Sequence, residues 1–212
     1  MIKKIFVTLA ILVCFKSSIY ASVVPNKMND IPPNSIGVYQ VENKLTVYKE
    51  PHTESPIVFE EIINYGALLD KYTSNTLCIL IPQKQLGYVF ATDCDEDWVE
   101  IIYDKTNNRK GWVLKEDSFQ FMPWITFYNM YGRKYGLITL ISTQKEVMTV
   151  YSQPEESAQQ IAKIHHPKQI RLTSTEGNWA LVTILDTENN TYTGYIQWRD
   201  INGKYYIFPD VK

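Results

Sequence analysis

Apolar and polar side chains alternate with a period of two residues in two short stretches that lie about half a chain length apart. Leu45 and Val47 alternate with polar neighbours in the first stretch, and Met148 and Val150 do so in the second. Between these stretches, Trp98–Tyr103 is a run of residues that mostly favour β-strands. The patterns predict short strands, and they contain no long amphipathic helix.

Turn-forming residues separate the predicted strands. Lys105–Asn108 and Glu188–Thr191 are rich in Asn and Thr, and each is followed by a glycine that precedes an aromatic residue. We expect these glycines, Gly111 and Gly194, where a bend or bulge at the corner of a barrel leaves no room for a Cβ atom. Many short strands separated by turns predict a small β-sandwich or barrel.

Four blocks of sequence occur twice in the same order, which indicates an internal duplication. The paired blocks are Lys44–Ile62 with Val147–Ile164, Asp95–Asp104 with Gly177–Asp186, Lys110–Asp117 with Thr193–Asp200, and Phe119–Pro123 with Tyr205–Pro209. The duplication predicts two units of the same fold.

The order of these motifs resembles that of bacterial SH3 domains. Each copy has a V-Y-x-x-P block, a strand, a strand led by tryptophan, and then G-(W/Y)-(V/I) with a closing Asp. The resemblance covers Lys44–Pro123 and Val147–Pro209, although the family usually carries Asn-Val-Arg where this chain has Thr46–Tyr48 and Thr149–Tyr151. It implies an all-β fold of two tandem small SH3-like barrels.

The predicted organisation has five parts. The first copy contains additional sequence, in which Cys78–Pro82 and Gly87–Ala91 are expected to form an added hairpin. The predicted parts are a signal peptide at 1–21, an N-terminal arm at 22–43, the first repeat at 44–123, a connecting segment at 124–146 and the second repeat at 147–212.

Aromatic residues dominate the connecting segment. Trp124, Phe127, Tyr128 and Tyr131 recur at helical spacing, which predicts one or two helical turns. Flexible linkers are rich in Gly and Ser instead. We therefore expect this segment to pack against both units and to hold them in a fixed orientation.

The first 21 residues are typical of a secretory signal peptide. Lys3 and Lys4 form a basic start, Ile5–Phe15 is apolar, and Ala21 ends a short polar stretch with small-residue spacing. The apolar run is much shorter than the ~20 residues that span a bilayer. The leader predicts export to a periplasm, a cell envelope or the extracellular space.

The charge of the chain argues against nucleic acid as a partner. Removal of Lys3, Lys4 and Lys16 with the leader changes the formal net charge from −2 to −5. Phosphate binding requires clustered Lys and Arg, and the chain has no basic block. After the leader, no stretch approaches the length of a transmembrane segment.

Two cysteines, Cys78 and Cys94, remain after the leader. In an oxidising compartment they could form one disulfide, and an antiparallel hairpin would bring them together. The alternative is that both are small buried apolar residues.

The histidines do not indicate a catalytic centre. His52 lies in a predicted loop, and His165 and His166 are adjacent, so on a strand they would point to opposite faces. Bacterial SH3 modules often accompany cell-wall cysteine peptidases, but no residues remain here for a second, catalytic domain. The sequence predicts a protein that is not an enzyme and that uses no cofactor.

One acidic stretch has the spacing of the start of a calcium loop. Asp93, Asp95 and Asp97 alternate, but Trp98 occupies the sixth position, where such a loop requires glycine. An acidic hairpin turn is the better interpretation, and no metal site is predicted.

Aromatic side chains are the remaining candidates for ligand binding. Tyrosine and tryptophan in particular combine an apolar body with a polar tip. For Trp98, Trp112 and Trp179 we favour a core position, whereas the tyrosines and Trp198 are expected to be exposed. The candidates are Tyr48, Trp98 and Trp112 in the first copy and Tyr151, Trp179, Tyr195 and Trp198 in the second.

The resemblance to bacterial SH3 domains implies a partner in the cell envelope. It implies binding of peptidoglycan, its stem peptides or another envelope protein through shallow aromatic grooves. The alternative hypothesis is a structural or interaction subunit that packs on an envelope protein.

Overall fold

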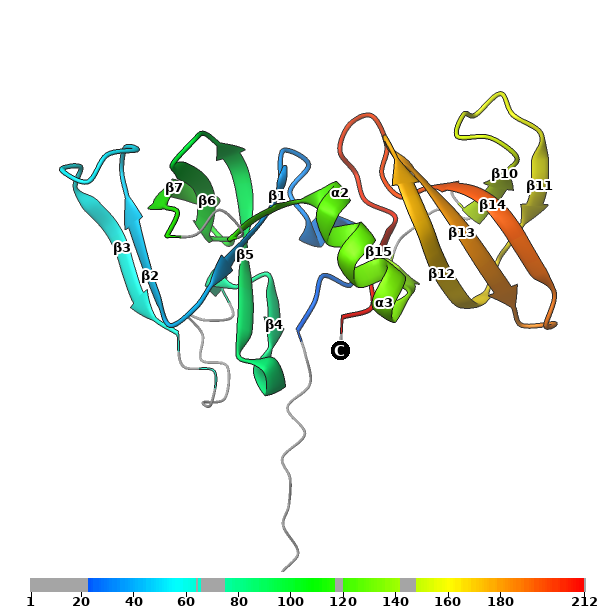
Figure 1. Ribbon diagram of the computed structural model, residues 1–212, viewed down its shortest axis with the longest axis horizontal. Coiled ribbons are helices and arrows are strands. Elements are labelled where there is room, and N and C mark those ends of the chain that lie inside the picture. Colours follow the sequence, from blue (N-terminus) through cyan, green and yellow to red (C-terminus); the bar gives the residue numbers. More distant parts are fainter. Residues whose placement is uncertain (1–22, 64, 66–74, 117–119, 142–147, 212) are drawn as a thin grey trace, which may run out of the picture.

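The protein is all-β, as predicted, with one helical segment between two antiparallel sheets (Figure 1). The computed structural model describes residues 23–63, 65, 75–116, 120–141 and 148–211. The predicted signal peptide, 1–21, lies outside the described residues. Among those that are described, no helix has the length and apolar character to cross a membrane.

The first sheet runs in the order β3-β2-β7-β6-β5-β1-β8, and β4 pairs with β5 beside this path. A 3₁₀ turn, η1 (Met28–Asp30), precedes the sheet, and η2 (Pro82–Lys84) joins β4 to β5. Its strands are β1 (Gly37–Val41), β2 (Lys44–Tyr48), β3 (Ile57–Ile62), β4 (Ile79–Ile81), β5 (Leu86–Cys94), β6 (Trp98–Asp104), β7 (Arg109–Leu114) and β8 (Phe121–Pro123).

The second sheet repeats this order strand for strand, as β11-β10-β14-β13-β12-β9-β15. β1 comes from the predicted N-terminal arm and β9 from the predicted connecting segment, and both are part of a sheet. The strands are β9 (Leu137–Thr139), β10 (Thr149–Tyr151), β11 (Gln160–Lys163), β12 (Pro167–Glu176), β13 (Trp179–Asp186), β14 (Thr191–Gln197) and β15 (Ile207–Pro209).

Irregularities in the ladders also repeat between the sheets. The register of β2 with β3 shifts between Val47 and Tyr48, and that of β10 with β11 shifts between Val150 and Tyr151. A second shift between β5 and β6 recurs at the matching place between β12 and β13. Because bulges are specific features of a fold, their recurrence supports the predicted duplication.

Within the described residues, neither sheet closes into a barrel. The end strands β3 and β8 do not pair with each other, and neither do β11 and β15. The predicted added hairpin is present, since Ile79 lies opposite Tyr88. However, β5 is the counterpart of β12, so the strand that the first copy adds to the common order is β4 alone.

The two glycines predicted at corners are required by a close strand approach. A Cβ atom on Gly111 would lie 2.5 Å from Val47 Cγ1, and one on Gly194 would lie 2.5 Å from the Tyr151 carbonyl oxygen. No register shift occurs at either glycine. The prediction that these positions have no room for a Cβ atom is therefore confirmed, but the reason is close contact with β2 and β10 and not a bulge.

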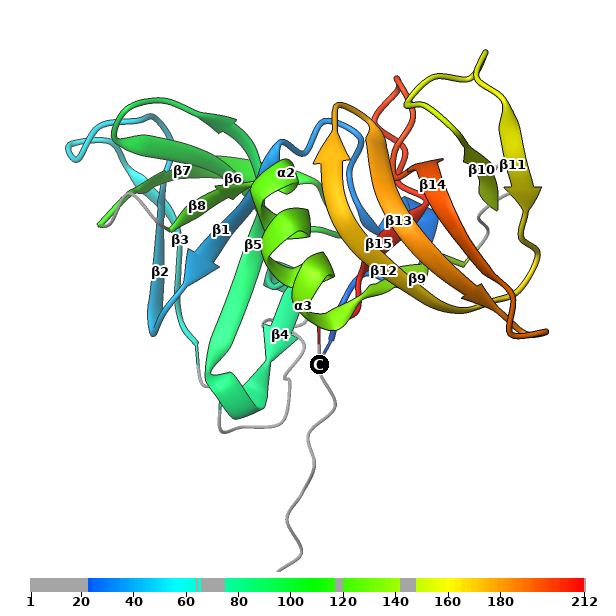
Figure 2. The ribbon, with the colours of Figure 1, turned by 45° about the vertical axis from the view of Figure 1, so that its right-hand side comes forward.

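A helix between the sheets contributes to a core that both halves share (Figures 1 and 2). It consists of α2 (Trp124–Phe127), a π-helical turn η3 (Tyr128–Gly132) and α3 (Arg133–Tyr135). The predicted packing of the aromatic stripe against both units is confirmed, because the ring centroid of Trp124 lies 6.2 Å from that of Phe90 and 5.8 Å from that of Phe208.

The two halves therefore differ in their hydrophobic cores. One buried cluster is confined to the first sheet and includes Val47, Val99 and Val113. The inner residues of the second sheet belong instead to the shared cluster, together with the helix and with residues of the first sheet. The second half has no separate cluster among the described residues.

Candidate functional site

An aromatic face lies on β2, β6 and β7 of the first sheet. Tyr48 is directly opposite Trp112, and Trp112 is directly opposite Glu100, so all three share one face. The ring of Trp98, two residues from Glu100 on the same face, meets the Tyr48 ring edge-on with centroids 5.4 Å apart. We call this group the first aromatic face.

The second sheet repeats this arrangement at the equivalent positions. Tyr151 is directly opposite Tyr195, which is opposite Leu181. The rings of Tyr151 and Trp179 are also edge-on, with centroids 5.4 Å apart and an interplanar angle of 85°. This second aromatic face brings together three of the four candidates predicted for the second copy.

Most side chains of these faces are half-buried. Trp98 is 8% exposed and therefore packs as a core residue, as predicted. Trp112 and Trp179 are half-buried, so they are more accessible than the predicted core position. Tyr48 and Tyr151 are half-buried too, and each holds its ring against a tryptophan.

Trp198 does not belong to the second aromatic face, and the prediction that it is exposed is wrong. Its side chain is 1% exposed and its indole N–H donates to the Gly177 carbonyl at 2.9 Å. The Tyr128 ring of the helix lies 4.5 Å from it. The shared core therefore buries Trp198. The sequence around Trp198 does not indicate this contact, because the contact comes from the helix.

A polar group that the sequence did not predict lies beside the first aromatic face. Glu100 accepts from the Lys110 ammonium at 3.1 Å, and the Thr92 hydroxyl also donates to its carboxylate. At the equivalent positions of the second face are Leu181 and Thr193. At these positions the first face carries an ion pair and the second is uncharged, although the Glu156 carboxylate accepts from Gln197, which lies opposite Trp179, at 2.9 Å. Cross-strand register would have been needed to predict this difference.

Both cysteines are free thiols, so the disulfide, one of the two alternatives, is not formed; Cys78 is buried, as the other alternative expects, whereas Cys94 is half-buried. The Cys78 backbone N–H donates to the Tyr88 carbonyl, which places Cys78 beside that residue. Cys94 lies six residues further along β5, roughly 20 Å away at ~3.3 Å per residue, far beyond the reach of a disulfide. Burial raises the pKa of the Cys78 thiol to about 12.

The histidines and the acidic stretch occupy separate surface positions. His52, His165 and His166 are all exposed, and they lie in loops of different halves. Asp95 accepts from the backbone N–H of Asp97 and of Trp98, which makes the stretch a hairpin turn. In the described part of the chain, no three His, Cys, Asp or Glu side chains are grouped so as to hold a metal ion.

No family model matches this chain, and a search of curated proteins finds no match.

Proposed function

We propose that this protein is an exported, non-catalytic binding protein that recognises peptidoglycan or cell-envelope peptides through its two aromatic faces. The observation that carries the proposal is the recurrence of one edge-on Tyr–Trp pair at the same register position in both sheets. We further propose that each sheet is a unit of the bacterial SH3 type. The matching strand order and the matching register shifts support that assignment.

Half-buried aromatic rings suit flat or extended ligands. A tyrosine or tryptophan held edge-on by its neighbour offers apolar surface at little cost in side-chain entropy, and its polar tip can pair with a hydroxyl or an amide. Sugar rings and extended peptides combine the same two kinds of group. The ion pair of Glu100 and Lys110 would add a polar contact on the first face.

Two faces on one polymer would strengthen binding through effective concentration. Because the shared core joins the sheets, a ligand bound to one face and long enough to reach the other meets the second face at a high effective concentration. Export through the predicted leader would place the protein where such polymers occur.

Sedimentation with purified bacterial sacculi tests the proposal. The test variant is Tyr48→Ala/Tyr151→Ala, which removes one ring from each face. The matched control is Tyr103→Ala/Tyr192→Ala, because these half-buried tyrosines lie on the opposite faces of β6 and β14.

We expect the wild type and the control to sediment with sacculi and the test variant to bind at least about tenfold more weakly, as for the loss of central aromatic contacts. If neither wild type nor variants sediment, peptidoglycan is not the ligand, and titration with stem peptides decides between the two ligand classes. Equal sedimentation of the test variant and wild type would remove the role of the aromatic faces.

A second candidate function is that of an interaction subunit, and the free edge of β3 favours it. Among the described residues, β3 pairs only with β2, and Ile57, Val58 and Ile62 are exposed on it, with Ile62 at 76%. An extended segment of an envelope protein could add a strand at this edge. Ile62→Lys would then abolish capture of that protein and leave sacculus binding intact.

A further inference from the structure

A hollow with a volume of about 470 Å³ lies between the N-terminal segment and the first sheet, away from both aromatic faces. This volume is in the usual range for small-molecule sites. Its described lining combines apolar side chains with amides, one carboxylate and one ammonium. Val23, Val24, Pro25, Asn26, Asn29, Asp30, Pro32, Cys78, Phe90, Ile102, Lys105 and Asn108 line it.

This hollow is formed by elements that distinguish the first half from the second. Val23 and Leu80 exchange two backbone hydrogen bonds of 2.8 Å, which attach the N-terminal segment to β4. β4 has no counterpart in the strand order of the described second sheet. The hollow is therefore not inherited from the common fold of the two copies.

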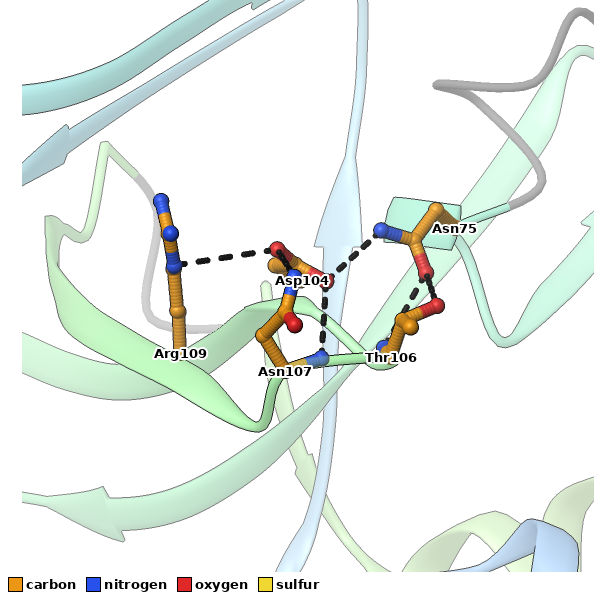
Figure 3. A network of polar contacts seen from close by, with 5 residues as sticks. All are labelled: Asn75, Asp104, Thr106, Asn107 and Arg109. Carbon is orange, nitrogen blue, oxygen red and sulfur yellow. Dashed lines mark hydrogen bonds and ion pairs between the residues drawn. The ribbon is translucent and has the colours of Figure 1, made fainter.

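A polar network fixes the turn that carries the ammonium of the hollow (Figure 3). The Asp104 carboxylate accepts from the Asn75 amide and from the Asn107 amide, each at 2.7 Å. Asn75 in turn accepts from the Thr106 hydroxyl at 2.7 Å, and its carbonyl accepts from the backbone N–H of Lys105 at 3.1 Å. Asn75 belongs to the sequence that the first copy adds, and it holds Lys105 at the hollow.

Lys105 has no carboxylate partner there. Its half-buried ammonium donates to the Leu77 carbonyl, and none of the three ion pairs among the described residues includes it. Asp30 lines the same hollow, and one oxygen of its carboxylate, Oδ2, accepts from the backbone N–H groups of Asn26 and Lys27. Burial lowers the pKa of Lys105. The nearby Asp30 carboxylate raises the pKa of Lys105 by less than burial lowers it, so the ammonium is incompletely compensated, and an anion bound beside it would reduce the cost of its burial.

The floor beside Lys105 suits an apolar group. Phe90, Ile102 and Cys78 line the hollow and are almost fully buried, whereas Val23 and Val24 supply more accessible apolar lining. We propose that this hollow binds a small carboxylate with an apolar body, whose carboxylate pairs with Lys105 and whose body lies against the apolar lining. Fatty acids and N-acyl amino acids share this chemistry.

Calorimetric titration with octanoate, N-acetylphenylalanine and the neutral control octanol tests the proposal. We expect at least one carboxylate to bind the wild-type protein at least about tenfold more tightly than octanol. The better of the two carboxylates identifies the source of the ligand.

Two lysine variants separate the hollow from general charge effects. In Lys105→Met the preference for a carboxylate over octanol should disappear. In Lys115→Met it should persist, because Lys115 also donates to a backbone carbonyl, that of Asp95, but lies outside the hollow. Lys105→Arg should retain the preference, and thermal melts of each variant confirm folding.

Equal affinity for octanoate, N-acetylphenylalanine and octanol would overturn the proposal, as would an unchanged preference in folded Lys105→Met or no binding of any probe at about 10 mM. The variant Tyr48→Ala/Tyr151→Ala should bind the carboxylate like the wild type. This result would hold whether or not the aromatic faces bind sacculi.

Discussion

Replacement of Trp124 by alanine is expected to uncouple the second half from the first. The side chain is 2% exposed, and its ring lies within 6.3 Å of five other aromatic rings. Removing a buried tryptophan costs about 3–5 kcal/mol, a large part of the ~5–15 kcal/mol that stabilises a typical protein. Its indole N–H also donates to the Ser35 carbonyl at 3.1 Å, and this hydrogen bond contributes about 0.5–1.5 kcal/mol.

Urea unfolding followed by the indole NMR signals of Trp98 and Trp179 measures this coupling. In the wild type we expect both signals to report one transition, because the shared core spans the two halves. In Trp124→Ala, the Trp179 signal should unfold at a lower urea concentration than the Trp98 signal. The first half retains a cluster of its own, whereas the inner face of the second sheet loses its main aromatic partner.

The half-buried Trp112, which lies outside both buried clusters, provides the control. Trp112→Ala should lower the stability less and keep the two signals coincident. Coincident transitions in Trp124→Ala, or a loss of less than about 1 kcal/mol in the free energy of unfolding, would refute the argument that the second half depends on the shared core.

Three further predictions concern single positions. Gly194→Ala should destabilise the protein by about 1–3 kcal/mol in thermal melts, because the new Cβ would lie 2.5 Å from the Tyr151 carbonyl oxygen. Iodoacetamide at pH 8 should alkylate Cys94 and spare Cys78, whose thiol pKa burial raises to about 12, as peptide mass spectrometry would show. Hydrogen bonds from Asn107 and Asn75 lower the pKa of the half-buried Asp104 from 3.8 to about 2, so its stabilisation is complete above pH 3.8 and is lost as the pH falls through 2. Asp104→Asn should therefore lower the melting temperature at pH 7 and have a smaller effect near pH 2.

Each of these predictions has an outcome that contradicts it. Gly177→Asn serves as the control for Gly194→Ala, because nothing lies within 4 Å of a Cβ at Gly177 and asparagine accepts its φ of +55°. Equal melting temperatures of the two variants would show that β10 moves away from position 194 and makes room for the added Cβ atom. A peptide containing both Cys78 and Cys94 in a disulfide would contradict the register of β4 and β5. An Asp104→Asn effect of equal size at pH 7 and pH 2 would contradict the role of its carboxylate.

Local features of the fold could be predicted from the sequence because local chemistry determines them. The alternation at Lys44–Tyr48 gives one buried and one accessible side of β2, and the Asn-rich turn after Asp104 closes as a turn in the structure. The repeat also placed Tyr48 and Tyr151 at equivalent sites, since matched sequence blocks fold into matched ladders.

Features that depend on how distant segments pack could not be predicted in this way. The burial of Trp198 follows from the position of Tyr128 on the helix, and nothing in its own strand signals that contact. The separation of Cys78 and Cys94 follows from the register of β4 with β5, which extends β5 well past its partner. The hollow beside Lys105 needs the N-terminal segment and β4 together, so it had no signal in any single motif.

The position of the helix decides where this chain can be divided. A fragment that ends at Pro123 would keep the complete valine-rich interior of its sheet. A fragment that begins at Leu137 would leave Trp198, Tyr205 and Phe208 facing water, because Trp124 and Tyr128 normally cover them. The two halves therefore depend on the helix to different degrees. Without it, Tyr88 and Phe90 lose their contacts with Phe127 and Trp124, but the first half keeps a buried cluster of its own, whereas the described second half has none.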